Sequence, residues 1–192
     1  MFNIVIISGS VREGRQSHHV ALYFEKYITE GKLANAEILD LKEFNFPIFE
    51  ERLMYQKDPS DKAKLFGDKV KNADAVIIVS PEYNGSFPAA LKNALDLLVK
   101  EWYRKPVGLV SVSGGGFGGV TTLAAMQTSL LKLKVIPTGT FPVPLVQDNF
   151  DAQGNAKDKA GADKRANVFI KDLLWFCEAV QGMKKSSESG HN

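Results

Sequence analysis

The chain has 192 residues, of which 44% are hydrophobic and 24% are charged, and its formal net charge is +2. This length suits one domain with a buried core of its own, and no stretch approaches the roughly 18 consecutive apolar residues of a membrane span. A charge this small, with lysines scattered among acidic residues, does not favour a nucleic-acid partner. We therefore expect a soluble protein with a single domain over residues 1–181 and a polar, disordered tail over residues 182–192.

Cysteine and histidine are too sparse to predict a metal centre. The only cysteine, Cys177, cannot form a disulfide within the chain, and it lies in an apolar helical pattern that favours a packing role. The three histidines, at positions 18, 19 and 191, do not form a spaced ligand set with carboxylates. The amino terminus runs into a strand pattern without a basic segment or cleavage site, so we expect a cytoplasmic protein.

Five short apolar runs alternate with longer helical patterns, which is typical of a doubly wound α/β protein. The runs at 4–7 and 76–79 are apolar on both faces, as expected of central strands covered by helices on both sides, whereas the more polar run at 37–40 suits an edge. The predicted strands span residues 2–8, 37–40, 75–80, 106–113 and 135–139. Right-handed crossovers favour the flavodoxin-like order 2-1-3-4-5, which places the loops after strands one, three and four side by side.

Two predicted connections, 41–60 and 140–157, are longer than the roughly 12 residues that are usual in compact domains, and such connections are often functional. The first is rich in aromatic residues, namely Phe44, Phe46, Phe49 and Tyr55. These side chains could either wall a ring-shaped pocket or pack at a subunit contact.

The segment after the first strand has the composition of a phosphate-binding loop that opens a helix at about Ser17. Its glycines free the backbone to curl, Ser10 and Ser17 offer hydroxyl groups, and Arg12 supplies positive charge near the helix amino terminus. A nucleotide P-loop would carry Lys-Ser/Thr where this chain has Arg15-Gln16, which disfavours a triphosphate. The alternative is a plain strand-to-helix turn, which does not need so many serines, glycines and arginines.

The most informative segment follows the third predicted strand and runs from Ser80 to Pro88. Prolines stiffen its two ends, and Asn84-Gly85 is a turn pair. Polar and aromatic groups lie between the prolines, at Glu82, Tyr83 and Ser86. Since ligands bind outside the carboxyl ends of strands in open α/β sheets, this loop is predicted to hold a flat ligand. A plain strand-to-helix connection is the alternative.

After the fourth predicted strand, a glycine run contains a formal G-x-G-x-x-G between Gly114 and Gly119. A dinucleotide fingerprint also requires the first strand of its unit and an acidic residue about twenty positions on. No acidic residue occurs between Gly119 and Gln147, so that reading is disfavoured. We expect these glycines to let the backbone lie close to a ligand ring, with close helix–sheet packing as the alternative for Gly118 and Gly119.

Together the three loops predict a site for a phosphorylated planar ring. No serine-histidine-acid order, paired catalytic carboxylates or metal-ligand spacing competes with this interpretation. If the protein is an enzyme, a cofactor is expected to supply its chemistry, and no protein side chain is assigned as a catalytic acid or base.

Several segments resemble the NADPH-dependent FMN reductase family, which includes quinone, azo-dye and chromate reductases. The resemblance rests on Gly9-Ser10-Val11-Arg12, on Ser80-Pro81-Glu82-Tyr83-Asn84-Gly85-Ser86 and on Leu91-Lys92-Asn93-Ala94-Leu95-Asp96. The segments at 46–50 and 150–154 also look like those of the family, so the likeness covers most of the chain. It implies a flavodoxin-like fold, FMN as cofactor and a homodimer or homotetramer.

The resemblance also implies site residues. The FMN phosphate would be held by Ser10, Arg12 and Ser17, with neighbouring contacts from Gln16 and His18. The flavin ring would be bordered on one side by Pro81, Glu82, Tyr83, Asn84, Gly85 and Ser86, and on the other by Ser113, Gly114 and Gly115.

The activity so implied is hydride transfer from NADPH or NADH, through FMN, to a quinone-like or other small acceptor. The alternative is a flavodoxin-type electron carrier or a flavin-binding redox sensor without NAD(P)H turnover. Carriers of that kind are usually acidic, and this chain is not. The residues leave open the choice between NADPH and NADH, the physiological acceptor, and the choice between dimer and tetramer.

Overall fold

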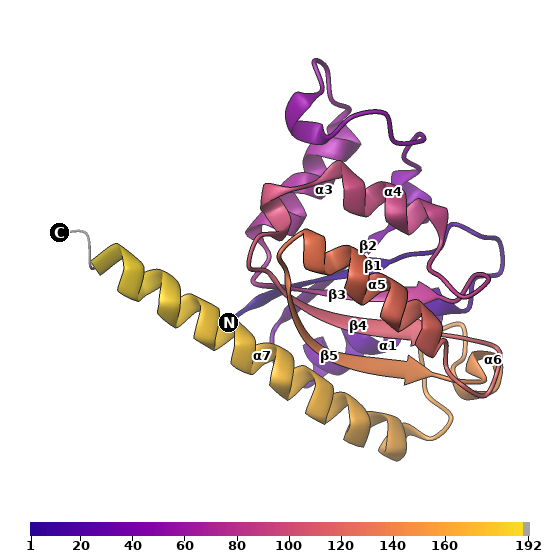
Figure 1. Ribbon diagram of the computed structural model, residues 1–192. Coiled ribbons are helices and arrows are strands. Elements are labelled where there is room, and N and C mark those ends of the chain that lie inside the picture. Colours follow the sequence, from indigo (N-terminus) through magenta and orange to yellow (C-terminus); the bar gives the residue numbers. More distant parts are fainter. Residues whose placement is uncertain (190–192) are drawn as a thin grey trace.

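The computed structural model describes residues 1–189 and is built around a five-stranded parallel sheet in the order β2-β1-β3-β4-β5. The strands are β1 (Asn3–Ser8), β2 (Asn35–Asp40), β3 (Ala75–Pro81), β4 (Pro106–Val112) and β5 (Ile136–Val143). Figure 1 shows helices on both faces of this sheet. The predicted flavodoxin-like fold class and strand order are therefore confirmed.

The helices divide the core into two halves. One face of the sheet packs against α1 (Ser17–Glu30) and α7 (Lys159–Ser189), and the other against α3 (Asp61–Asn72), α4 (Ala89–Leu97) and α5 (Val120–Lys132). The remaining elements are short: α2 (Leu41–Phe44), α6 (Val146–Asn149), η1 (Leu53–Tyr55) and η2 (Lys100–Trp102). Alternate residues of β1 and β3 enter opposite halves, which explains why both strands are apolar on both faces.

The last strand differs from its predicted span of 135–139, because β5 continues to Val143. Pro142 interrupts the local strand pattern, but proline is tolerated where a strand lies at the edge of a sheet. Phe141 also holds the extension in place, since it is 3% exposed and its ring packs against Phe24 and Phe169.

The carboxy-terminal helix also differs from the expectation of a disordered segment after residue 181. Helix α7 continues through Gly182 to Ser189, and in Figure 1 its end projects beyond the sheet. No proline interrupts this stretch, and Met183, Lys184 and Lys185 all favour helix. Residues 190–192 lie outside the described part of the chain. Among the described residues, no helix has both the length and the apolar character needed to cross a membrane.

Candidate functional site

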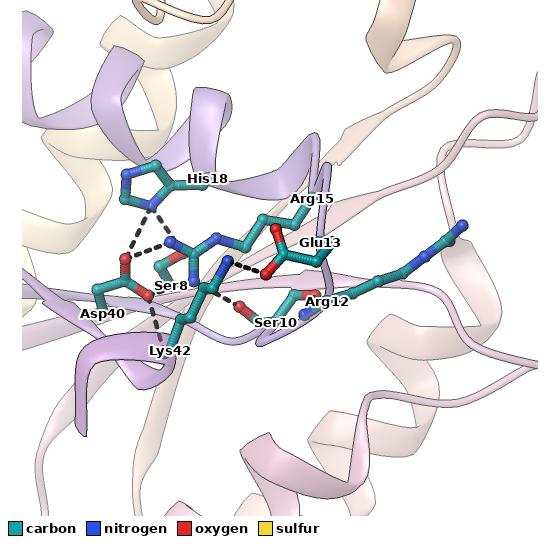
Figure 2. A network of polar contacts seen from close by, with 8 residues as sticks. All are labelled: Ser8, Ser10, Arg12, Glu13, Arg15, His18, Asp40 and Lys42. Atoms are coloured by element: carbon teal, nitrogen blue, oxygen red, sulfur yellow. Dashed lines mark hydrogen bonds and ion pairs between the residues drawn. The ribbon is translucent and has the colours of Figure 1, made fainter. Parts of the chain in front are cut away.

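The loop between β1 and α1 is curled and held closed by one of its own side chains. Gly14 has a φ of +64°, a left-handed conformation that glycine adopts at little cost, and a side chain there would meet open space. Arg15 turns back across the loop and donates a hydrogen bond of 2.8 Å from Nη1 to the carbonyl oxygen of Ser10. Both terminal nitrogens of this guanidinium also bind the carboxylate of Asp40, at the carboxyl end of β2 (Figure 2).

His18 belongs to the same network and not to the open side of the loop. Its Nδ1 lies 3.1 Å from the hydroxyl of Ser8 and 3.7 Å from the carboxylate of Asp40. Burial lowers the pKa of His18, although the charge of Asp40 acts in the opposite direction. The Ser8 hydroxyl donates to Nδ1 if the ring carries its proton on Nε2, and it accepts from Nδ1 if the proton is there.

The amino terminus of α1 has the features of an anion site. Ser17 begins the helix and is 1% exposed, and its hydroxyl has no hydrogen-bond partner among the residues that the structure describes. The cap residue Gln16 makes no side-chain capping bond, and its amide reaches only the carbonyl of Gly14, at 3.4 Å. Arg12 is exposed and extends away from the Asp40 network (Figure 2). The positive end of a helix, an unpartnered buried hydroxyl and a free guanidinium suit an anionic ligand.

The loop after β3 is a tight turn held by hydrogen bonds within itself and to neighbouring elements. Tyr83 and Ser86 exchange backbone hydrogen bonds of 2.7 and 3.1 Å around Asn84 and Gly85, whose φ values of 50° and 80° correspond to the predicted Asn-Gly turn. The hydroxyl of Thr122, in α5, donates to the carbonyl of Ser86 at 2.8 Å.

Two further contacts anchor the start of this turn. The backbone amide of Glu82 donates to the carbonyl of Val112 at 2.9 Å, which extends the pairing of β3 with β4. The hydroxyl of Tyr83 lies 2.9 Å from that of Ser10, which joins this loop to the loop after β1.

The glycine run after β4 has two parts with different roles. In the first part, Gly115 donates its amide to the hydroxyl of Ser113 at 2.9 Å, and a side chain at Gly116 would meet open space. In the second part, Gly118 and Gly119 have φ values of 65° and 73°, and a Cβ on Gly118 would come within 3.0 Å of Pro142. The close-packing alternative therefore holds for these last two glycines.

The structure brings the predicted loops together at the carboxyl edge of the sheet. Besides the Ser10 to Tyr83 contact, the amide of Gly9 donates to the carbonyl of Val79 at 2.9 Å. A Cβ on Gly119 would lie 3.4 Å from the Glu82 carboxylate, which places the second and third loops in contact. In residues 1–189 we find no group of histidine, cysteine or acidic side chains arranged to hold a metal ion.

Asp40 is the central member of this network, and the sequence analysis did not single it out. It is 6% exposed, and its carboxylate also accepts the backbone amide of Lys42 at 3.0 Å, which caps α2. An acidic residue at the end of a strand predicted to lie beside the first strand was the available signal. Without a known partner, that acid was indistinguishable from the ordinary polar end of a strand.

The aromatic residues of the first long connection do not all lie in one place. The rings of Phe44 and Phe46 pack against each other and against Phe66 of α3, at the border of the core, and Phe46 also lines a surface pocket with Pro47 and Phe49. The side-chain amide of Asn93, in α4, donates to the carbonyl of Pro47 at 2.5 Å and accepts the amide of Phe49. This pair of bonds holds the connection against α4.

Comparisons with known proteins agree with the fold and identify the family. A family model described as NADPH-dependent FMN reductase matches residues 2–148. The chain is 32% identical over 161 residues to an NAD(P)H-dependent FMN reductase of Saccharomyces cerevisiae, covering 72% of this chain and 83% of that protein. It is 30% identical over 185 residues to an NADPH azoreductase of Bacillus sp., covering 95% of this chain and 96% of that protein.

A solved structure gives the same picture of the fold. The flavoenzyme NAD(P)H:(acceptor) oxidoreductase FerB from Paracoccus denitrificans superimposes with a TM-score of 0.75 at 23% identity, covering 92% of this chain and 97% of that one. The sheet order defines a flavodoxin-like fold, and the family match makes the chain a flavoprotein. More narrowly, the chain belongs to the NADPH-dependent FMN reductase family and is an FMN-dependent NAD(P)H oxidoreductase, which confirms the prediction of an enzyme with this cofactor.

Proposed function

We propose that the loop from Ser10 to Ser17 holds the FMN phosphate and that the loops after β3 and β4 border the flavin ring. The observation that carries this proposal is the unpartnered, buried hydroxyl of Ser17 at the start of α1. A polar group buried without a partner is costly, and a bound phosphate would satisfy it. Arg12 supplies the charge, and the amides at the start of α1 supply further donors.

When bound, FMN supplies a ring that accepts a hydride and passes electrons on. The protein's part is to orient that ring. The turn at Asn84 and Gly85 is fixed at both ends by backbone bonds, so it presents a rigid edge to a flat ligand. Ser113, Gly114 and Gly115 would line the opposite side, where exposed glycines leave room for close approach of the backbone.

We further propose that the electrons go from NAD(P)H to a quinone-like acceptor. A quinone reductase of Pseudomonas putida is 33% identical to this chain over 139 residues, covering 69% of the chain and 72% of that protein. A net charge of +2 also tolerates an anionic reduced cofactor better than a strongly acidic protein would, which favours two-electron transfer. Arg15 is engaged by Asp40, so it does not serve as a ligand for the extra phosphate of NADPH.

Anaerobic mixing of the FMN-loaded protein with NADPH or NADH tests the donor half of this proposal. We expect the visible absorbance of the bound flavin to bleach on mixing and to return when a quinone is added. Free FMN at the same concentration, without protein, is the control. A bound flavin that neither nicotinamide bleaches would contradict turnover and would leave an electron carrier or sensor.

The exposed apolar side chains of the first long connection support self-association. Ile48 is 89% exposed and Tyr55 is 60% exposed, and both lie on the segment that Asn93 holds against α4. We propose that a second copy of the chain covers them, giving a homodimer or a homotetramer. Light scattering of Ile48→Asp should show a smaller mass than the wild-type protein, with Leu65→Asp on α3 as a control of similar chemistry.

We also propose that the protein is cytoplasmic, and cell fractionation tests this location.

A further inference from the structure

The Arg15 side chain lies in the proposed phosphate loop but does not face its open side. Its guanidinium forms a two-pronged pair with Asp40, and the two side chains are only 13% and 7% exposed. Such a forked pair fixes the orientation of both groups as well as holding their charges together. Arg15 therefore has a single, defined position before any ligand arrives.

The same guanidinium closes the loop. Its Nη1 donates to the carbonyl oxygen of Ser10 at 2.8 Å, so residues 10 and 15 are joined across the curl (Figure 2). Arg12 lies inside this closed segment, and Ser17 lies two residues beyond its end. The two groups best placed to bind a phosphate thus depend on a loop whose shape is set by Arg15, and the orientation of Arg15 is set by Asp40.

A second contact ties the loop to the same place. The ammonium of Lys42, in α2, lies 2.6 Å from the carboxylate of Glu13, and the backbone amide of Lys42 donates to the carboxylate of Asp40. The Lys42 and Glu13 side chains are 39% and 90% exposed, so this pair is screened by water and contributes less than the buried pair. The junction of β2 and α2 nevertheless holds the loop at two points, Glu13 and Arg15.

The negative charge of Asp40 is unfavourable for a residue near an anion site. A carboxylate beside a bound phosphate repels it, so an Asp40 without a positional role would only weaken binding. Its near-complete burial and its three bonds, two to Arg15 and one to the amide of Lys42, indicate that position matters more than charge.

We propose that Asp40 is a positioning residue for the FMN phosphate, acting through Arg15 to hold the loop in its binding conformation before the cofactor enters. This inference rests on the proposed function of the loop. A preorganised loop loses less conformational entropy on binding, which is the source of the gain in affinity. The rival arrangement makes Arg15 a direct phosphate ligand that Asp40 merely restrains.

The two arrangements predict opposite changes in FMN affinity for Asp40→Asn. This substitution keeps the shape of the side chain and removes its negative charge. If Asp40 positions the loop, FMN binding weakens; if Asp40 only restrains a direct ligand, FMN binding tightens because Arg15 is released. Arg15→Lys separates the roles further, because it keeps the positive charge and loses the fork.

The test is a titration of the cofactor-free, full-length protein with FMN and, separately, with riboflavin, which lacks the phosphate. Quenching of flavin fluorescence gives the dissociation constants. For Asp40→Asn and for Arg15→Lys we expect FMN affinity to fall about tenfold or more, as is typical when a supporting partner of a ligand-binding group is lost. Riboflavin affinity should stay within about twofold of the wild-type value, because the ring site is not altered.

Glu37→Gln is the matched control. Glu37 is a second carboxylate on β2 in an ion pair, at 2.6 Å from Lys69 of α3, but it does not contact the loop. This variant should bind FMN as the wild-type protein does. Thermal unfolding of each cofactor-free variant shows whether the chain still folds. If Asp40→Asn does not fold, the inference is tested with Arg15→Lys, and unchanged FMN binding by that variant overturns it.

Three results would overturn the inference: tighter FMN binding by Asp40→Asn, unchanged FMN binding by both variants, or an equal loss of FMN and riboflavin binding. The last would show a general structural role. Failure of the proposed function gives a different result, namely a wild-type protein that binds riboflavin as tightly as FMN or binds neither.

Discussion

The hydroxyl groups of Ser10 and Tyr83 lie 2.9 Å apart and join two loops that are 73 residues apart in the chain. Ser10 is fully buried, so this bond is shielded from competing water. It fixes the phosphate loop relative to the turn that we propose borders the flavin ring. This bond adds to the pairing of β1 with β3 and to the bond from the Gly9 amide to the Val79 carbonyl, which also hold the two halves of the cofactor site together.

Tyr83→Phe should therefore weaken FMN binding, because it removes this hydroxyl and keeps the aromatic ring at position 83. A neutral hydrogen bond contributes about 0.5–1.5 kcal/mol, so we expect the dissociation constant to rise about 2- to 10-fold. Fluorescence titration with FMN measures it. Tyr103→Phe, at a 50% exposed tyrosine that contacts Arg104, is the control and should change nothing. An unchanged constant for Tyr83→Phe would show that the two loops are positioned independently.

Ser17→Ala should move stability and cofactor binding in opposite directions. The hydroxyl of Ser17 is buried without a partner in the described structure, so its removal should leave the cofactor-free protein as stable or about 1 kcal/mol more stable. The same change removes a donor to the phosphate and should weaken FMN binding. Thermal unfolding and FMN titration measure the two effects. Parallel losses in both would show that Ser17 has a structural partner in solution.

Arg12→Ala should weaken FMN binding and leave the fold intact, because Arg12 is exposed and lies apart from the Asp40 network. A hydrogen bond to a charged group contributes about 1.5–3 kcal/mol, which corresponds to a loss of roughly 10- to 150-fold in affinity. The loss should shrink when riboflavin replaces FMN. Lys64→Ala, on the exposed side of α3, controls for the change in net charge. Equal losses for FMN and riboflavin would place Arg12 away from the phosphate.

The fold was accessible from the sequence because its signals are local and repeated. Apolar runs such as 4–7 and 76–79 mark central strands without any knowledge of their partners, and the handedness of crossovers then leaves few strand orders. The edge strand β5 was cut short because Pro142 breaks the local pattern. Only the tertiary packing of Phe141 against Phe24 shows that the strand continues.

The site was accessible in part, for the same reason. Residues within one loop, such as Asn84-Gly85, carry their conformation in their own chemistry. The partner of Arg15 cannot be recognised from the local sequence, because Asp40 is 25 residues away and becomes a neighbour only once β2 lies beside β1. The sequence therefore indicates no partner for Arg15, whereas the structure pairs it with Asp40.

Gly108→Ala should destabilise the fold, whereas Gly139→Ala should not. Both glycines face the ring of Phe169, from β4 and β5. A Cβ on Gly108 would lie 2.5 Å from the tip of this ring, while one on Gly139 would lie 3.5 Å away, in ordinary contact. Because Phe24 and Phe141 enclose the ring, it has little room to move, and overpacking of this kind costs about 1–3 kcal/mol. Chemical denaturation of the two variants compares them directly, and equal stabilities would show that the ring relaxes.

The stability of the protein should also depend on pH through Lys105. This lysine is 8% exposed, and its ammonium donates to the carbonyls of Lys71, at 3.0 Å, and of Ala73, at the end of α3. Burial lowers its pKa to about 8 from an ordinary value of 10.5, with a smaller contribution from the charge of Lys184. Between these two values the unfolded chain holds a proton that the folded chain has released.

Stability should consequently rise with pH from about 8 upward, because the folded state no longer contains a buried charge. Burial raises the pKa of the Cys177 thiol to about 12 from 9, which has the opposite effect above pH 9, so the clean window is pH 8 to 9. Within it, the free energy of unfolding of the wild-type protein should increase by up to about 1 kcal/mol relative to Lys105→Met. Lys132→Met, on the exposed face of α5, should keep the wild-type slope. Parallel pH profiles for the wild-type protein and Lys105→Met, measured by denaturation at fixed ionic strength, would show that Lys105 stays charged in the folded protein throughout this range.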